Sequence, residues 1–280
     1  MPITLVQPGS PRSAVVTGAA RGIGKAIAVE LVLRGYEVVV TDVDIDAAER
    51  TAEQIGARAG LRLDVTDPDA NAAVAAAARE IAPLGAWVCN AGVLFEGDLT
   101  AITTGQARAM VEVNVLGVMW GVRAAAQAFR EQAAIGIKGG EIGIMASLSA
   151  HAPVRGLATY AATKAAVLSL ATSLHAELRK DRIRVHALCP DGVSTPMVDA
   201  MDPEGGTRAI LAAGVMYEPQ QVALALVDMF GTRRVYRTMP VWRGVIGRTA
   251  TMAPRVAARV DPVLRRVGAM RLKRAARRTD

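Results

Sequence analysis

Short runs of β-branched residues alternate along this chain with longer, alanine-rich stretches. The predicted strands cover residues 13–17, 37–41, 62–65, 86–89, 142–145 and 184–188. The predicted helices between them cover residues 23–33, 45–54, 70–81, 106–132 and 158–179. Each connection is long enough for a right-handed crossover helix, so consecutive strands lie parallel and helices cover both faces of the sheet. The pattern predicts an α/β fold built on one doubly wound parallel sheet.

Composition places the chain among ordinary folded proteins. It has 280 residues, of which 51% are hydrophobic and 21% are charged. Those fractions exclude disordered, collagen-like and disulfide-stapled classes. Because an α/β chain of this length can keep one core, we predict a single sheet-bearing domain over residues 1–239. A basic, partly helical extension is expected over residues 240–280.

The net charge of +7 conceals two segments of opposite character. Residues 231–280 hold 14 Lys or Arg against two acidic residues, a net charge of +12, whereas the first 230 residues carry −5. Asp261 and Pro262 are typical of an N-cap followed by a proline at the first helical position. The extension is therefore expected to contain a short helix with an apolar face and several arginines.

Two interpretations of this extension stay open. Its helix can lie at a membrane surface with the arginines among anionic headgroups, or the extension can pack against the acidic body or a neighbouring protomer. Gly268 weakens the helix by about 1 kcal/mol relative to alanine, which slightly favours the second interpretation. Nucleic acid is not expected as a partner, because no stacking aromatic residues are interleaved with the bases.

The sequence predicts a cytoplasmic protein, with membrane association only through the extension. Its longest uncharged stretch, residues 81–95, is interrupted by proline and glycine and is shorter than the roughly 20 apolar residues of a membrane span. No apolar signal-peptide run is found at the N-terminus. Cys89 and Cys189 end strands that should be separated by a third strand, beyond disulfide range, so both are expected to be buried thiols.

The first predicted strand runs directly into the segment TGAARGIG, residues 17–24. Glycines at a strand-to-helix turn permit positive φ and let the backbone come close to a pyrophosphate, while the helix N-terminus offers free N–H groups. A tight turn without a ligand is the simpler alternative. Asp42 ends the second predicted strand 18 residues after Gly24, near the offset at which an acidic residue binds ribose hydroxyls. This combination favours a dinucleotide site in a Rossmann-type fold.

Further motifs follow in order: Asp64-Val65, Asn90-Ala91-Gly92, Asn114, Ser147, and Tyr160-Ala161-Ala162-Thr163-Lys164. Together with TGAARGIG, they resemble the short-chain dehydrogenase/reductase family in order and spacing over residues 12–197, about two thirds of the chain. The resemblance implies that residues 1–239 form a catalytic domain. It implies an NAD(P)-dependent oxidoreductase that transfers a hydride between nicotinamide and a secondary alcohol or ketone. It also implies a homodimer or homotetramer.

Tyr160 and Lys164 are four residues apart and so share one helical face. An ammonium beside a phenol, whose free pKa is about 10, favours the phenolate, so we expect the pKa of Tyr160 to be lowered and Tyr160 to act as general acid and base. The alternative is a tyrosine and a lysine on a solvated helix face. Ser147 is placed to hydrogen-bond the substrate oxygen. The family implies that Asn114 holds a helix kink and a water linked to Lys164.

The resemblance also implies which residues contact the cofactor: Gly18, Arg21, Gly22, Ile23, Gly24, Asp42, Asp64, Val65, Asn90, Ala91, Gly92, Tyr160, Lys164, Val193 and Thr195. NAD is favoured over NADP, because the Asp42 carboxylate would repel a 2′-phosphate and no basic residue follows it. One departure concerns the family pattern Pro-Gly-x-Val-x-Thr, which here reads Pro-Asp-Gly-Val-Ser-Thr from Pro190. With Asp191 in that turn, the turn is expected to be remodelled and the Thr195 contact is less secure.

Two alternative functions are kept. One is an NADPH-dependent ketoacyl or quinone reductase, in which Arg21 would meet the 2′-phosphate. The other is a catalytically silent nucleotide sensor or scaffold, which would be expected to lose Tyr160 or Lys164, whereas both are present.

The segments expected to face the substrate, residues 148–154 and 197–217, are mostly apolar and predict a hydrophobic alcohol or ketone. His151 is expected to be a solvated loop residue, and His175 and His186 are expected to be structural. No metal is expected, because no cluster of His, Cys and acidic residues has ligand spacing.

Overall fold

A computed structural model describes residues 11–151, 154–201 and 215–252, together with residues 255, 266 and 270. Its centre is a seven-stranded sheet in the order β3-β2-β1-β4-β5-β6-β7, and every neighbouring pair is parallel. The strands are β1 Arg12–Thr17, β2 Tyr36–Asp42, β3 Ala59–Arg62, β4 Leu84–Cys89, β5 Gly140–Met145, β6 Ile183–Pro190 and β7 Tyr236–Met239. The predicted doubly wound, Rossmann-type sheet is confirmed.

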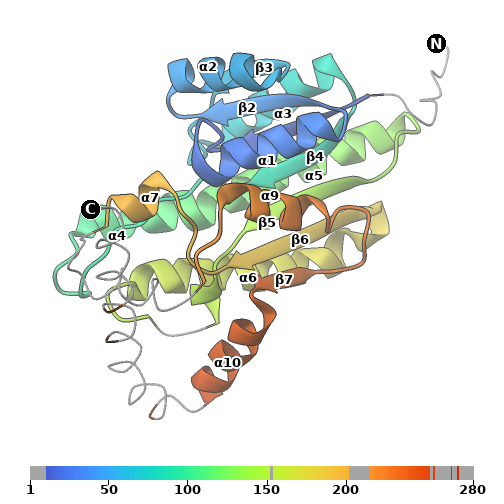
Figure 1. The fold of residues 1–280 in the computed structure, drawn as a ribbon. Coiled ribbons are helices and arrows are strands. Elements are labelled where there is room, and N and C mark those ends of the chain that lie inside the picture. The colour runs from blue at the N-terminus through green and yellow to red at the C-terminus, as the bar shows by residue number, and fades with distance from the viewer. Residues whose placement is uncertain are drawn as a thin grey trace.

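Helices cover both faces of this sheet (Figure 1). They are α1 Gly22–Leu33, α2 Ile45–Ile55, α3 Pro68–Ile81, α4 Thr104–Val111, α5 Gly117–Ala134, α6 Ala158–Leu178, α7 Pro196–Asp199, α9 Pro219–Val227 and α10 Val241–Met252. Helices α1, α2 and α9 supply buried residues to one apolar core, and α3, α5 and α6 supply the other. The sheet separates the two cores.

The register of the strands places side chains of neighbouring strands side by side in the same core. Val39, Val15, Trp87, Ile142 and Val185 are paired in a row across five adjacent strands, and all five lie in the core beneath α3, α5 and α6. On β1, β2 and β4 the residues on either side of them belong to the opposite core, as the two-residue period of a strand requires.

Two predicted elements differ from the structure. The third strand is Ala59–Arg62, not residues 62–65, because its Ala-Gly-Leu-Arg sequence has no β-branched residue to reveal it. Gly60 lets that strand lie against α2, since a Cβ there would come within 2.5 Å of the Glu49 backbone. The predicted helix over residues 106–132 is divided by a π-helical turn, Glu112–Leu116, between α4 and α5.

The helical run Thr104–Ala134 is long enough to cross a membrane, and its most apolar 18-residue window has a mean hydropathy of 1.3. This run contains charged residues, so it is not an uncharged stretch of the sequence. Half of its most apolar window is buried inside the protein, and Val118, Val122 and Phe129 belong to the core. The run therefore packs as a core helix of the α/β fold.

The two cysteines lie where the strand order was predicted to put them. Cys89 ends β4 and Cys189 lies in β6, with β5 between these strands. Both are buried free thiols, as expected.

The predicted extension begins with a helix that packs on the body. α10 follows β7 directly and continues away from the end of that strand (Figure 1). Gly244 lies against Thr238, since a Cβ at Gly244 would come within 2.7 Å of the threonine side chain. Of the short helix predicted near Pro262, only Arg266 and Met270 are among the described residues, and both are helical and exposed.

Candidate active site

A cavity of about 1690 Å³ lies across the carboxyl ends of the strands. The order of the strands reverses between β1 and β4, and open α/β sheets bind their ligands at such a switch point. The cavity is larger than the roughly 300–1,000 Å³ of a typical small-molecule site. It therefore has room for an elongated ligand together with a second, smaller one.

The glycine loop after β1 forms one part of the cavity wall. Gly18 and Gly22 have φ of +62° and +57°, a region that favours glycine. A Cβ at Gly24 would overlap the Gly18 carbonyl and the Asn90 side-chain amide. Ile23 and Arg21 line the cavity beside these glycines. The loop leaves a cradle at the start of α1, which fits a pyrophosphate.

Asp42 and Asn90 hold this loop from either side. The Asp42 carboxylate accepts a hydrogen bond from the Ala20 backbone at 3.2 Å, so the acid lies beside the glycine loop at the end of β2. The Asn90 amide donates to the carbonyls of Thr17 and Gly18, both at 3.0 Å. Asn90 therefore joins the end of β4 to the loop, as Asp42 joins the end of β2 to it.

The remaining predicted cofactor residues also line the cavity: Asp64, Val65, Ala91, Gly92, Val193 and Thr195. Hydrogen bonds from the Thr66 hydroxyl and backbone lower the pKa of Asp64 and keep it an acceptor. Thr195 stays buried at the cavity in spite of Asp191, and its hydroxyl donates to the Val193 carbonyl at 3.3 Å. The turn that contains Asp191 therefore still places Thr195 at the wall of the cavity.

Ser147, Tyr160 and Lys164 meet in the middle of the cavity. Ser147 follows β5, and the other two lie one turn apart on α6. The side chains of Ser147 and Tyr160 are hydrogen-bonded. The Lys164 ammonium lies 5.6 Å from the centre of the Tyr160 ring and donates to the Met145 carbonyl at 2.8 Å. The sequence alternative of a solvated helix face is therefore wrong.

The pKa of Tyr160 differs from the expectation. Burial raises it to about 12, and the hydrogen bond from Ser147 opposes this only in part. Burial also lowers the pKa of Lys164, to about 8. Desolvation thus outweighs the nearby ammonium, so that Tyr160 is a neutral phenol near pH 7 and is prepared to donate a proton.

Asn114 lies fully buried in the π-helical turn. Its carbonyl accepts from the Val93 backbone at 2.8 Å, and its amide donates to the Val93 carbonyl at 2.9 Å and to Thr163 at 3.2 Å. The kink implied by the resemblance is present. The side chain is fully engaged with the protein and joins the Asn90–Val93 loop to α6; the water relay stays a prediction.

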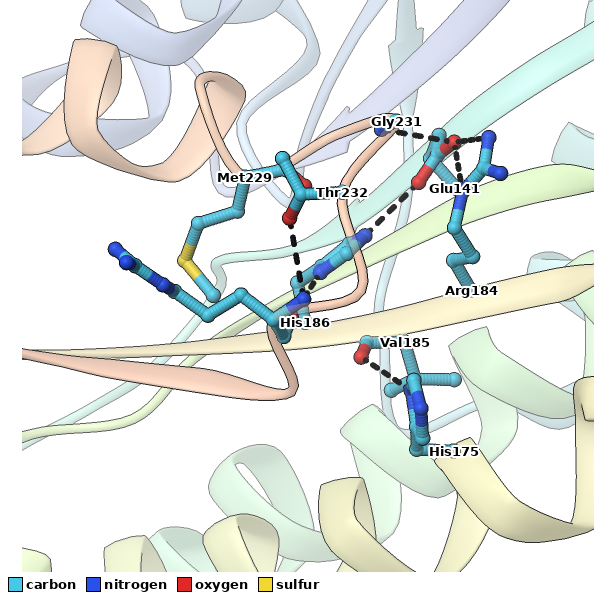
Figure 2. A network of polar contacts seen from close by, with 9 residues as sticks. Glu141, His175, Arg184, Val185, His186, Met229, Gly231 and Thr232 are labelled. Carbon is cyan, nitrogen blue, oxygen red and sulfur yellow. Dashed lines mark hydrogen bonds and ion pairs between the residues drawn. The ribbon is translucent and has the colours of Figure 1, made fainter.

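The histidines have structural contacts, and one expectation for them was wrong. His151 is buried, with Nε2 3.4 Å from the Thr238 hydroxyl, so it is not a solvated loop residue. His186 is buried between the Arg234 carbonyl and the Glu141 carboxylate, and His175 contacts the Val185 carbonyl (Figure 2). Within the part of the chain that the structure describes, no three His, Cys, Asp or Glu side chains could share a metal ion.

Sequence reasoning missed the contribution of α10 to the cavity. Arg243, Ile246, Gly247 and Thr249 of this helix line it. The departure at Asp191 was the available signal, since the Asp191 carboxylate forms an ion pair with Arg243. The apolar end of the cavity is completed by Leu148, Leu157, Met197 and Met201.

Comparisons with known proteins agree with this geometry. The family model for short chain dehydrogenases matches residues 12–205. The chain is 32% identical to 3-beta-hydroxysteroid dehydrogenase of Comamonas testosteroni, over 75% of this chain and 85% of that protein. It is 36% identical to 1-deoxy-11-beta-hydroxypentalenate dehydrogenase of Streptomyces exfoliatus, over 74% and 78%.

A solved structure of similar fold is 3-ketoacyl-(acyl-carrier-protein) reductase of Brucella melitensis complexed with NADH, with a TM-score of 0.71 and 30% identity. The match covers 81% of this chain and 96% of that one. With the seven-stranded sheet, the glycine cradle and the Ser147–Tyr160–Lys164 cluster, these matches show that the chain belongs to the short-chain dehydrogenase/reductase family, and that it is an oxidoreductase of the kind that binds a nicotinamide cofactor.

Proposed function

We propose that this enzyme interconverts an apolar secondary alcohol and its ketone, using NAD in preference to NADP. The observation that carries the proposal is that Ser147, Tyr160 and Lys164 line one cavity together with the glycine cradle and Asp42. Many of the other residues that line this cavity are apolar. A hydroxyl bound at the cluster would face the cofactor on one side and bury its carbon skeleton on the other.

Each side chain has a separate task. The nicotinamide supplies the hydride acceptor or donor when it is bound. The Ser147 hydroxyl holds the substrate oxygen, and the Tyr160 phenol gives that oxygen a proton in reduction or removes one in oxidation. Lys164 places a positive charge beside Tyr160 and is held by the Met145 carbonyl. Asn114 keeps α6 and the Asn90–Val93 loop in position.

The cavity wall favours an apolar, bulky substrate. The apolar side chains that line the cavity include those of Leu148, Leu157, Met197, Met201 and Ile246. The names of two relatives, a hydroxysteroid and a hydroxypentalenate dehydrogenase, support a hydroxyl on a ring skeleton as the substrate class. The ketoacyl reductase in the structural comparison supports the alternative of an acyl ketone.

The preference for NAD rests on Asp42. Its carboxylate lies at the end of β2 beside the Ala20 backbone, where it can accept from a ribose diol and would repel a 2′-phosphate. Titration of NADH and NADPH by fluorescence is the test. We expect tighter NADH binding in the wild type, and a narrowed or reversed preference in Asp42→Ala, with Arg21 nearby. Tighter NADPH binding by the wild type would overturn the assignment.

The decisive experiment for the activity is Tyr160→Phe, assayed with a panel of cyclic and linear secondary alcohols and NAD. We expect kcat to fall by about 10²–10⁴-fold, as for loss of a general acid/base, with NADH binding retained. Tyr36→Phe is the matched control, because Tyr36 is outside the cavity lining. Retention of more than about a tenth of kcat by Tyr160→Phe would show that the phenol is not the proton-transfer group. A wild type that binds NADH and turns over nothing would support the silent sensor.

A further inference from the structure

Asp191 occupies a position where the family pattern has glycine, and the structure shows what its carboxylate does there. The side chain is 3% exposed and pairs with Arg243, whose side chain is 17% exposed. The same carboxylate accepts from the Val215 backbone at 3.1 Å, and the Asp191 backbone donates to the Met239 carbonyl at 2.8 Å. One residue thus connects the end of β6 with the residue 215 segment, the end of β7 and α10.

A second set of contacts holds the next turn of α10. The Arg248 guanidinium lies 4.9 Å from the centre of the Tyr236 ring, and its Nη2 is 3.5 Å from His151 Nε2. His151 follows Ser147 by four residues, at the end of the short turn Leu148–Ala150. These contacts tie α10 to β7 and to the loop that carries the catalytic serine.

The face of α10 that these contacts turn inward belongs to the cavity. Ile246 and its neighbour Val245 are almost equally exposed, at 56% and 55%. Only Ile246 is among the lining residues, together with Gly247 and Thr249. Gly247, next to Ile246, contributes only backbone to the cavity wall.

We propose that α10 is the specificity-determining wall of the substrate cavity, and that the buried Asp191–Arg243 ion pair is the positioning device that holds it there. The inference rests on the proposed function and names its substrate class further: an apolar secondary alcohol or ketone long or wide enough to reach Ile246 from Tyr160. The extension is then part of the active site. Asp191 and Arg243 are positioning residues and do not act on the reacting atoms.

The first test measures the position of α10 without any substrate. Hydrogen exchange of the full-length protein is followed in peptides covering residues 241–252. Asp191→Asn keeps the size of the side chain and removes its charge, so we expect exchange in α10 to be at least tenfold faster. Asp181→Asn, which breaks the Arg130–Asp181 surface ion pair, is the matched control. Unchanged protection of α10 in Asp191→Asn would overturn the positioning role.

A double-mutant cycle distinguishes this pair from a general loss of stability. Asp191→Asn and Arg243→Gln each leave a partner charge buried, whereas the double variant leaves none. We expect the exchange rate of α10 in the double variant to be closer to the wild-type rate than is the rate in the more damaging single variant. Strictly multiplicative effects of the two substitutions would contradict a direct pair.

The second test concerns specificity and uses Ile246→Ala against Val245→Ala. With NAD and the series from 2-butanol to 2-decanol, we expect Ile246→Ala to lower kcat/KM for the longest alcohols by about tenfold through KM. Its kcat/KM for 2-butanol should fall less than its kcat/KM for 2-decanol, and all values for Val245→Ala should stay near the wild type. Asp191→Asn should resemble Ile246→Ala. Equal effects of the two alanine variants would refute the wall.

Binding of 2-decanone to the NAD-loaded protein, by calorimetry, gives the same comparison without turnover, because the oxidised cofactor has no hydride to give the ketone. Weaker binding in Ile246→Ala than in Val245→Ala supports the wall even if no alkanol is oxidised. A wild type that oxidises no alcohol and binds no ketone contradicts the proposed function and with it the substrate wall; hydrogen exchange then judges the ion pair alone. A wild type that is active but indifferent to Ile246 contradicts the wall alone.

Discussion

The substitution Glu141→Gln tests the polar network at the amino end of β5, at the opposite end of the strands from the cavity. The Glu141 carboxylate accepts from Arg184 Nε at 2.7 Å, from His186 Nε2 at 2.9 Å and from the Gly231 backbone at 3.2 Å (Figure 2). The other nitrogen of His186 faces the Arg234 carbonyl at 2.6 Å. Both ring nitrogens of His186 therefore face oxygen atoms that can accept a hydrogen bond.

The cost of the substitution follows from which partner is buried. The Arg184 side chain is 46% exposed, so its share is at most about 1 kcal/mol. His186 is fully buried, and leaving a buried polar group without its hydrogen-bond partner costs about 1–3 kcal/mol. We expect Glu141→Gln to lower the free energy of unfolding by about 2–3 kcal/mol at pH 7.

The pH dependence of the effect gives a second readout. Burial raises the pKa of Glu141, but hydrogen bonds from His186 and Arg184 outweigh it and the net shift is downward. The stabilisation is thus complete above the unfolded pKa of about 4.3 and is lost as the pH falls through the lower folded value. Urea unfolding at pH 3–7 should show the wild type and Glu141→Gln converging in acid. Arg184→Gln is the control, with a loss below about 1 kcal/mol. A Glu141→Gln effect under about 0.5 kcal/mol at pH 7, or one independent of pH, would refute the reasoning.

Three further outcomes are expected. Gly24→Ala should abolish NADH binding in a fluorescence titration, because the added Cβ overlaps the Gly18 carbonyl and the Asn90 amide. Gly105→Ala is the control and should bind NADH normally, since its Cβ would meet only Thr103 Oγ1 at 3.9 Å. Equal NADH affinities of the two variants would contradict the cradle. Since burial raises the pKa of Tyr160 to about 12, kcat/KM for alcohol oxidation should rise with pH between 7 and 9, by about tenfold per unit, while ketone reduction should change little; a flat oxidation profile would exclude the phenolate as the base. If the arginine-rich sequence beyond Met252 binds lipid, the full chain should co-sediment with anionic vesicles in low salt and dissociate in high salt, and a chain ending at Met252 should not co-sediment; absence of binding by the full chain would leave the protein-contact interpretation.

The sheet was predictable because several of its strands contain short runs of β-branched residues. Val38, Val39 and Val40 of β2 are all buried, which is what a parallel strand covered on both faces requires. The β3 strand was misplaced because it is held by a close approach to α2 at Gly60 rather than by strand-forming residues. Local propensity does not report such a tertiary contact.

The site was predictable where its residues are close in sequence and less so where they are not. Tyr160 and Lys164 share one helical face, and the glycine loop is a continuous segment. The burial that sets the pKa of Tyr160 comes from the whole fold, so its direction could not be inferred from Lys164 alone. The pairing of Asp191 with Arg243 spans 52 residues, and only the unusual aspartate hinted at it.

The number of residues in the π-helical turn at Asn114 sets the rotation of α5 relative to α4. A π turn holds one more residue than the α turn it replaces, so the chain on either side differs in rotation by about 100° from a continuous helix. Met110 before the turn and Val118 after it both reach the core, and the register of each depends on that extra residue. Deletion of any single residue within Glu112–Leu116 would therefore rotate one flanking helix away from the core and withdraw Asn114 from Val93.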